Sequence, residues 1–247
     1  MPKHTSTDAG TRREPVPVGL FLALARRPGT RRGALAAPDL PHWHGLAPGS
    51  LAYLIRRYTR CGDVVLDLDA HPSVAAAARY LRRAPARLVP AGHSFRVRLL
   101  SAPHGARRPR REVRRPGPGA ALVLVTLPRA GESSLDLHGT TRAIAAWRPL
   151  VRPGGFLIAA LTARGSQPAT ISHRSTVIAA ARTAGLIYHQ HIPVLLVPLP
   201  EHDPHTGPEA AGEPEDGRRL LAGRHLPAYR DLVVLAGTAT GEEATHA

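Results

Sequence analysis

The chain between residues 50 and 237 alternates short apolar runs with stretches whose apolar residues recur every three to four positions. Most of the runs are continuous, which is typical of strands buried on both faces of a sheet. The other stretches have the spacing of amphipathic helices. The pattern therefore predicts an α/β fold. We expect strands over 63–68, 86–89, 94–100, 121–127, 156–161, 186–199 and 231–237, and helices over 51–60, 72–83, 135–150 and 175–184.

The stretch from Gly62 to Arg83, GDVVLDLDAHPSVAAAARYLRR, has the clearest local pattern. It predicts a buried strand that ends at Asp67, an acidic turn that includes Asp69, and an alanine-rich helix in which Pro72 suits the first turn. In open α/β sheets a nucleotide-like cofactor lies beyond the carboxyl end of such a strand, near the helix N-terminus. We therefore expect a cofactor site at this turn.

The last two expected strands have no helix between them, so they predict an antiparallel edge pair in a mostly parallel sheet. The segment 151–155, VRPGG, is expected to turn the chain. Polar, proline-rich and glycine-rich segments suggest the organisation around this sheet. We expect a disordered or extended arm over 1–37, one domain over 38–237 with mobile loops at 101–119 and 200–227, and a disordered tail over 238–247.

Length and composition limit the class of protein. A chain of 247 residues with 43% hydrophobic residues can bury a full core. No apolar run approaches the roughly 18 residues that span a membrane, so we expect no membrane association. A single cysteine excludes an internal disulfide framework and fits a reducing, cytoplasmic location.

The formal charge of +15 has two explanations. Arginine neutralises phosphates and releases counterions, which favours a nucleic-acid partner. However, Lys3 is the only lysine and asparagine is absent, a pattern typical of GC-rich coding bias, which raises arginine content whatever the partner. The densest cationic segment is either a phosphate-contacting loop or a solvated insertion, and it holds Arg107, Arg108, Arg110, Arg111, Arg114 and Arg115.

Two other groups of residues suggest chemistry without a complete pattern. His42 and His44 are two apart, as are His189 and His191, and in a strand such pairs share a face. Neither pair has a carboxylate or cysteine at a recognisable spacing, so we assign no metal site; instead we expect Trp43 to pack on the domain. Ser134 and Asp136 lie outside any nucleophile-elbow sequence, and either fits better as the N-cap of the next helix.

Three segments together resemble the class I S-adenosylmethionine-dependent methyltransferases. VVLDLDAHPSV is similar to their first motif, ALVLVTLPR to their fourth, and WRPLVRPGGFLIAAL (147–161) to their helix, L-x-P-G-G, strand signature. PHWHGLAPGSLAYLIRRYTRCGDVVLD also resembles the approach segment of the amino-directed (N4/N6) DNA methylases, in which a His-containing loop and a helix precede the first motif. The resemblance covers residues 38–199 and 228–236.

The resemblance implies a Rossmann-like sheet that binds S-adenosylmethionine and methylates an exocyclic amino group of DNA or RNA. Carried over by position, the cofactor would lie against Asp67, Leu68, Asp69, His71 and Ser73. The residues in the catalytic positions of the fourth motif would be Thr126, Pro128 and Arg129.

The sequence also departs from the family's pattern at these motifs. His71 and Ser73 stand at the glycine positions of the first motif, and no acidic residue for the ribose follows strand 86–89. In the fourth motif one proline remains, and Arg129 replaces the aromatic ring that stacks on a flipped base. Two hypotheses follow. The chain is a methyltransferase of this type, active or impaired, or it is a non-catalytic module on the same frame that binds nucleic acid or protein.

Overall fold

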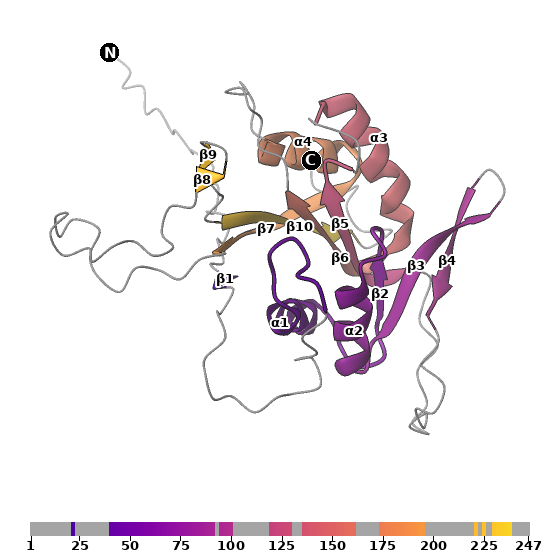
Figure 1. Ribbon diagram of the computed structural model, residues 1–247. Coiled ribbons are helices and arrows are strands. Elements are labelled where there is room, and N and C mark those ends of the chain that lie inside the picture. The colour runs from indigo at the N-terminus through magenta and orange to yellow at the C-terminus, as the bar shows by residue number, and fades with distance from the viewer. Residues whose placement is uncertain are drawn as a thin grey trace, which may run out of the picture.

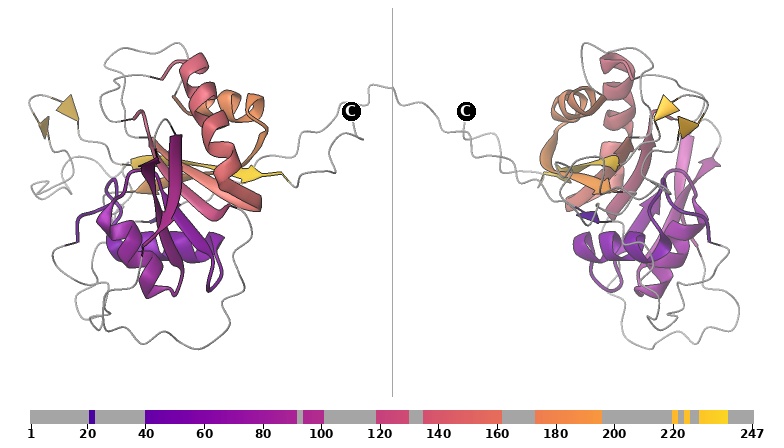
Figure 2. Two further views of the ribbon diagram at one scale, coloured as in Figure 1. Left: turned by 90° about the vertical axis from the view of Figure 1, so that its right-hand side faces the viewer. Right: turned by 60° about the vertical axis from the view of Figure 1, so that its left-hand side comes forward.

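The structure is a computed structural model that describes residues 21–22, 40–91, 94–100, 119–129, 135–161, 173–195, 220–221, 224–225 and 229–238. Its centre is an eight-stranded sheet with two helices on each face (Figures 1 and 2). The strands lie in the order β1-β7-β10-β6-β5-β2-β3-β4. They are β1 (Phe21–Leu22), β2 (Val64–Asp67), β3 (Ala84–Ala91), β4 (Ser94–Leu99), β5 (Ala120–Leu127), β6 (Val151–Leu161), β7 (Leu186–Leu195) and β10 (Tyr229–Gly237).

Strands β3, β2, β5 and β6 are parallel neighbours, and β10 runs antiparallel between β6 and β7. This confirms the predicted α/β fold of class I methyltransferase type, with a parallel core and a late antiparallel pair. At the other edge, β4 pairs antiparallel with β3. No orientation was predicted for this pair from the sequence; the two-residue connection between β3 and β4 is short enough only for antiparallel strands.

The helices cover the two faces of the sheet because strand residues alternate between them. Helices α1 (Pro48–Tyr58) and α2 (Pro72–Tyr80) pack with Val65, Leu122 and Ile158 in one apolar cluster. Helices α3 (Leu137–Trp147), which a 3-10 turn extends over Arg148–Leu150, and α4 (His173–Thr183) pack on the other face. Strands β2 and β5 are therefore buried on both faces, as their continuous apolar runs predict.

The structure changes one expected helix start and decides another. Helix α1 begins at Pro48, three residues before the expected start, with proline in the first turn where its missing N–H costs nothing. Of the two candidate caps for α3, Asp136 is the N-cap: its Oδ1 accepts a hydrogen bond of 2.7 Å from the Gly139 N–H.

The expected turn at 151–155 is wrong, because β6 begins at Val151. The two glycines allow an irregular start to this strand. Gly154 has φ +68°, and a Cβ on Gly155 would lie 2.9 Å from the Ala120 carbonyl oxygen, so β5 and β6 approach closely there. The pairing register shifts at the same place, between Ala120 and Leu122. The P-G-G signature is therefore explained by strand packing.

Several sequence expectations concern segments outside the described residues. They include most of the 1–37 arm, of which only Phe21–Leu22 is described, paired in parallel with β7. They also include the arginine segment 107–115 and most of 200–227, where only a two-stranded sheet is described, β8 (Leu220–Leu221) and β9 (Arg224–His225). The domain boundaries remain predictions. None of the described helices is long and apolar enough to cross a membrane.

Candidate functional site

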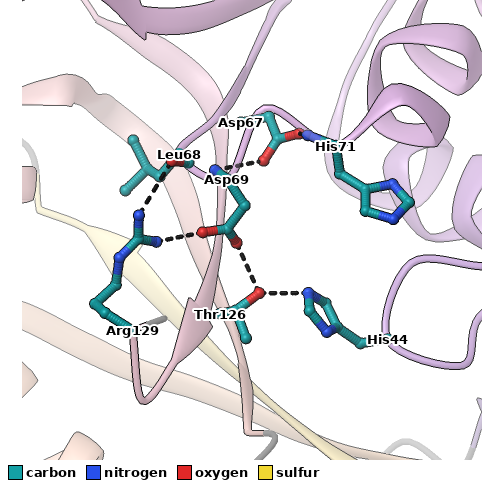
Figure 3. A network of polar contacts seen from close by, with 7 residues as sticks. All are labelled: His44, Asp67, Leu68, Asp69, His71, Thr126 and Arg129. Atoms are coloured by element: carbon teal, nitrogen blue, oxygen red, sulfur yellow. Dashed lines mark hydrogen bonds and ion pairs between the residues drawn. The ribbon is translucent and has the colours of Figure 1, made fainter. Parts of the chain in front are cut away.

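The residues predicted for the cofactor and for the target lie at the carboxyl ends of two neighbouring strands (Figure 3). From β2 the chain crosses to β3 on one side and later returns to β5 on the other, so β2 and β5 form a topological switch point. Open α/β sheets bind ligands at such a point. The structure thus brings together Asp67, Leu68 and Asp69 after β2 with Thr126 and Arg129 at the end of β5.

Asp67 is directed into its own turn. Its side chain is buried, with Oδ1 accepting from the Asp69 N–H at 2.9 Å and Oδ2 from the His71 N–H at 2.6 Å. Burial raises the pKa of the carboxyl to about 6, although these backbone hydrogen bonds act in the opposite direction. Asp67 therefore organises the backbone of the turn, and both of its oxygens are engaged in doing so.

The left-handed backbone position of this turn is Ala70, with φ +54°. His71, which stands at a glycine position of the family motif, has φ −73° and is the N-cap of α2. Its Nδ1 accepts from the Ser73 N–H at 3.3 Å, so Nε2 carries the proton of the neutral ring. Burial lowers the pKa of His71, which favours this neutral form.

Ser73, at the second glycine position, is fully buried and donates its hydroxyl proton to the Pro41 carbonyl oxygen. This bond attaches the start of α2 to the segment before α1. In that segment Trp43 and Leu46 exchange two backbone hydrogen bonds of 2.9 Å around His44 and Gly45, both with positive φ, as in a type I′ turn. Trp43 is fully buried, as predicted, and the turn presents the His44 ring to the end of β5.

A continuous polar network crosses the switch point (Figure 3). Arg129 forms an ion pair with Asp69 Oδ1 and donates to the Leu68 carbonyl oxygen at 3.2 Å. Thr126 Oγ1 donates to Asp69 Oδ2 at 2.6 Å and is also hydrogen-bonded to His44 Nε2. Since the hydroxyl proton goes to Asp69, His44 donates and the threonine oxygen accepts. Arg129 also lies over the Trp147 ring, 5.9 Å from its centroid.

His44 is the member of this network that was not among the predicted site residues. It is half-buried, and burial lowers its pKa while the Asp69 carboxylate acts in the opposite direction. The signal was present in the sequence, because PHWHG matches a His-containing loop that precedes the first family motif. Arg230 on β10 was also not predicted at this site. Its charge lies close enough to contribute to the lowered pKa of His44.

The direction of these hydrogen bonds limits the chemistry of the site. In a nucleophilic triad the histidine accepts the hydroxyl proton and the carboxylate holds the histidine. Here His44 donates to Thr126, and Asp69 contacts Thr126 and Arg129 instead, so the group is not such a triad. The same hydroxyl donates to Asp69 and accepts from His44, so its proton and one of its two lone pairs are already used. The side chains at this crevice therefore satisfy one another.

S-adenosylmethionine carries a positive sulfonium centre and a ribose diol, and both are held best by free carboxylates. Asp69 is already paired with Arg129 and Thr126, and both Asp67 oxygens are used by the turn. The end of β3 offers Leu88, Val89, Pro90 and Ala91, so it has no carboxylate for the ribose. As they are arranged, these residues do not fit the cofactor.

The second histidine pair, His189 and His191, is separated by an irregularity in β7. A shift in register within β7, between Tyr188 and Gln190, places His189 beside Tyr58 and Phe156 on the α1 face. His191 lies on the opposite face, with Nε2 2.5 Å from Asp231 Oδ1. The expected shared face is therefore wrong, because the irregularity breaks the alternation. Within the described ranges, no three metal-ligating side chains lie together.

No protein-family model and no curated protein matches this sequence. Similar solved structures include the M1.HpyAVI–SAM complex (13% identity, TM-score 0.27), for which the match covers 47% of this chain and 42% of that one. Another is the antibiotic-resistance methyltransferase Kmr (16%, 0.35), with coverage of 76% and 93%. A third, described as a possible exported protein from Bordetella parapertussis (12%, 0.36), has coverage of 78% and 67%.

This chain spans less than half the length of the M1.HpyAVI structure that it matches. Likenesses at these scores carry no argument about a cofactor or a substrate. The strand order and the parallel core give the chain a methyltransferase-like α/β fold, and its structural similarity to S-adenosylmethionine-dependent methyltransferases is distant.

Proposed function

We propose that this protein binds nucleic acid on a methyltransferase-like frame and does not transfer methyl groups. The observation that carries the binding proposal is a cationic face on the β3–β4 hairpin, which extends from the edge of the sheet (Figure 1). Arg87 on β3 and Arg96 and Arg98 on β4 are exposed. Arg96 and Arg98 are two apart on β4, and Arg98 pairs directly with Arg87, so the three share one face.

Like charges directly opposite each other in an antiparallel pair destabilise the hairpin. A polyanion that lies across Arg87 and Arg98 removes this repulsion, because each guanidinium can bind a phosphate through two parallel hydrogen bonds. The two arginines repel each other in the free protein, and in a complex both are attracted to the phosphates between them. The arginine segment 107–115 follows β4 after a few residues in the sequence, so it adds cations to the same part of the chain.

The carboxylates of the described residues do not offset this charge. Asp63 and Asp69 pair with arginines, Asp67 binds turn amides, Asp231 pairs with His191, and Asp136 caps α3. Of these five side chains, only that of Asp136 is exposed, whereas exposed arginines occur on α1, α2, α3, α4 and the hairpin. A coding bias explains many arginines but not the engagement of these acids, so the surface favours a polyanionic partner.

The test is the salt dependence of DNA binding. We expect fluorescence anisotropy with labelled duplex DNA to show an affinity that falls steeply with salt. Arg87→Ala/Arg96→Ala/Arg98→Ala should lower the slope by about two to three, since each phosphate contact contributes ~0.9. The control Arg142→Ala/Arg174→Ala/Arg182→Ala removes the same charge from α3 and α4. Equal loss in the control would contradict the hairpin assignment, and no binding by the wild type at low salt would overturn the proposal.

The second candidate is S-adenosylmethionine-dependent methylation of an exocyclic amino group. It is favoured by the placement of Asp67 and Thr126 at the carboxyl ends of two paired parallel strands, at the switch point. The network opposes it, so we expect calorimetric titration with S-adenosylmethionine to give no saturable heat. Saturable binding would overturn the non-catalytic assignment and favour this candidate. His71→Gly would then show whether the His71 side chain obstructs the cofactor. A gain in affinity for S-adenosylmethionine would mean that it does, and no gain would mean that the affinity is limited by other residues.

A further inference from the structure

A cleft lies at the other end of the parallel strands from the network around Thr126, near their amino ends. This α1–β6 cleft has a volume of about 480 Å³ and is lined by the C-terminal end of α1, the loop before β2, the start of β6 and the middle of β7. The volume is within the range of small-molecule sites. The cleft shares no residue with the network around Thr126, and no motif of the resemblance assigns it a role.

One wall of the α1–β6 cleft is aromatic. The Phe156 ring centroid lies 5.0 Å from that of Tyr58 and 5.1 Å from that of His189, at interplanar angles of 61° and 53°. The Tyr58 hydroxyl donates to Gln190 Oε1 at 2.9 Å and interacts with the Arg57 side chain, which fixes the ring. His189 is exposed, so its ring edges the open side of this wall. Such a wall suits a planar ring as ligand.

The rim of the cleft carries positive charge. Arg57 and Arg60 are exposed at the end of α1, and Arg152 follows on β6. The one acidic lining residue, Asp63, is neutralised by Arg152 through contacts of 2.8 and 3.2 Å and also accepts from the Arg60 N–H at 2.7 Å. Arg152 uses two of its five N–H groups in that pair. The rim therefore attracts an anion.

The rim is also held in place before any ligand arrives. Arg83 donates to the Thr59 hydroxyl at 3.0 Å and to the Thr59 carbonyl oxygen at 2.7 Å. The Asp63 N–H donates to the Arg60 carbonyl oxygen at 3.1 Å. A Cβ on Gly154 would meet no atom within 4 Å, so the floor of the cleft is open there. A preorganised rim lowers the entropic cost of binding.

We infer that the α1–β6 cleft binds one nucleotide unit, with its phosphate on Arg57 and Arg60 and its base against Phe156 and His189. Arginine and an aromatic surface side by side are the pair of groups that recognise a phosphate and a base together. The unit is either a free nucleotide or one residue of a single strand. The second source deepens the proposed nucleic-acid function and rests on it, whereas the first source is independent of it.

The test uses the full chain and calorimetric titration with thymidine 5′-monophosphate. Thymidine and inorganic phosphate are titrated separately, and each should bind at least about tenfold more weakly, because each lacks one half of the contacts. Arg57→Ala/Arg60→Ala should weaken binding of the monophosphate by about tenfold or more. His189→Ala should weaken it roughly fivefold through lost stacking. Arg142→Ala/Arg182→Ala, which removes equal charge elsewhere, should change little.

A short oligodeoxythymidylate separates the two sources. If Arg57→Ala/Arg60→Ala weakens its binding more than the control does, the unit belongs to a strand; if only the monophosphate is affected, the ligand is free. Both results support the site. Absence of saturable monophosphate binding, or an equal effect in the control, overturns it. Failure of duplex binding with intact monophosphate binding would contradict the proposed function alone.

Discussion

Asp67 shows how one buried carboxyl links the turn to the pH of the solution. Its pKa is raised to about 6 by burial, above the ordinary 3.8, so the native state holds a proton that the unfolded chain releases. Between these two values the native state binds more protons, and the free energy of unfolding therefore falls as pH rises. A shift of this size corresponds to about 3 kcal/mol.

Asp67→Asn should remove this pH dependence. The amide keeps one acceptor for the turn and loses the other, a cost that is the same at every pH. We expect the stability of the wild type relative to the variant to fall by up to about 3 kcal/mol between about pH 4 and pH 7. Urea unfolding of both proteins across this range measures the difference. A difference that stays constant with pH would contradict the raised pKa.

At the residue scale, sequence patterns located the site better than they described it. Asp67, Asp69, Thr126 and Arg129 were predicted there, and the structure brings them together because parallel strands end at one edge. The pattern could not show that Asp69 would bind Arg129 and Thr126. Side-chain direction and pairing depend on partners distant in sequence, and His44 lies 82 residues from Thr126.

At the element scale, the glycines of β6 and α1 give a matched pair of substitutions. A Cβ on Gly154 or on Gly49 would meet no atom within 4 Å, but only Gly154 has a positive φ. Gly154→Ala should therefore destabilise by about 1 kcal/mol, since a left-handed alanine costs ~1–2 kcal/mol. Gly49→Ala, in the first turn of α1, should stabilise by about 0.5 kcal/mol. Thermal unfolding monitored by circular dichroism measures both, and equal effects would contradict a backbone cause.

At the element scale, apolar periodicity predicts the strands but not the irregularities within them. Apolar runs identified β2, β5 and β6 because burial on both faces requires them. Periodicity cannot reveal an irregularity, because the register shift in β7 alters no apolar count and yet moves His189 and His191 to opposite faces. That shift also creates one side of the α1–β6 cleft. An irregularity in strand pairing can thus place residues of a candidate site where the sequence pattern does not predict them.

At the scale of the whole molecule, charge and fold provide different kinds of information. The order of strands and helices along the chain was enough for the fold class, since alternation of this kind permits few topologies. The formal charge of +15 alone could not distinguish a partner from coding bias. The structure adds that the described carboxylates are already engaged in other contacts, so they do not cancel the charge of the exposed arginines on the hairpin.

The excess of positive charge, formally +15, should also affect folding. Self-repulsion among surface arginines destabilises the compact state, and salt screens it over a Debye length of about 10 Å at 0.1 M. We expect the midpoint of thermal unfolding to rise by a few degrees between low salt and ~0.2 M sodium chloride. Arg142→Glu, at an exposed position in the middle of α3, should stabilise the protein at low salt and reduce this rise. The control Arg142→Lys, which keeps the positive charge, should behave like the wild type. A midpoint that falls with salt, or an Arg142→Glu effect that persists at high salt, would show that local contacts rather than net repulsion govern the stability of this surface.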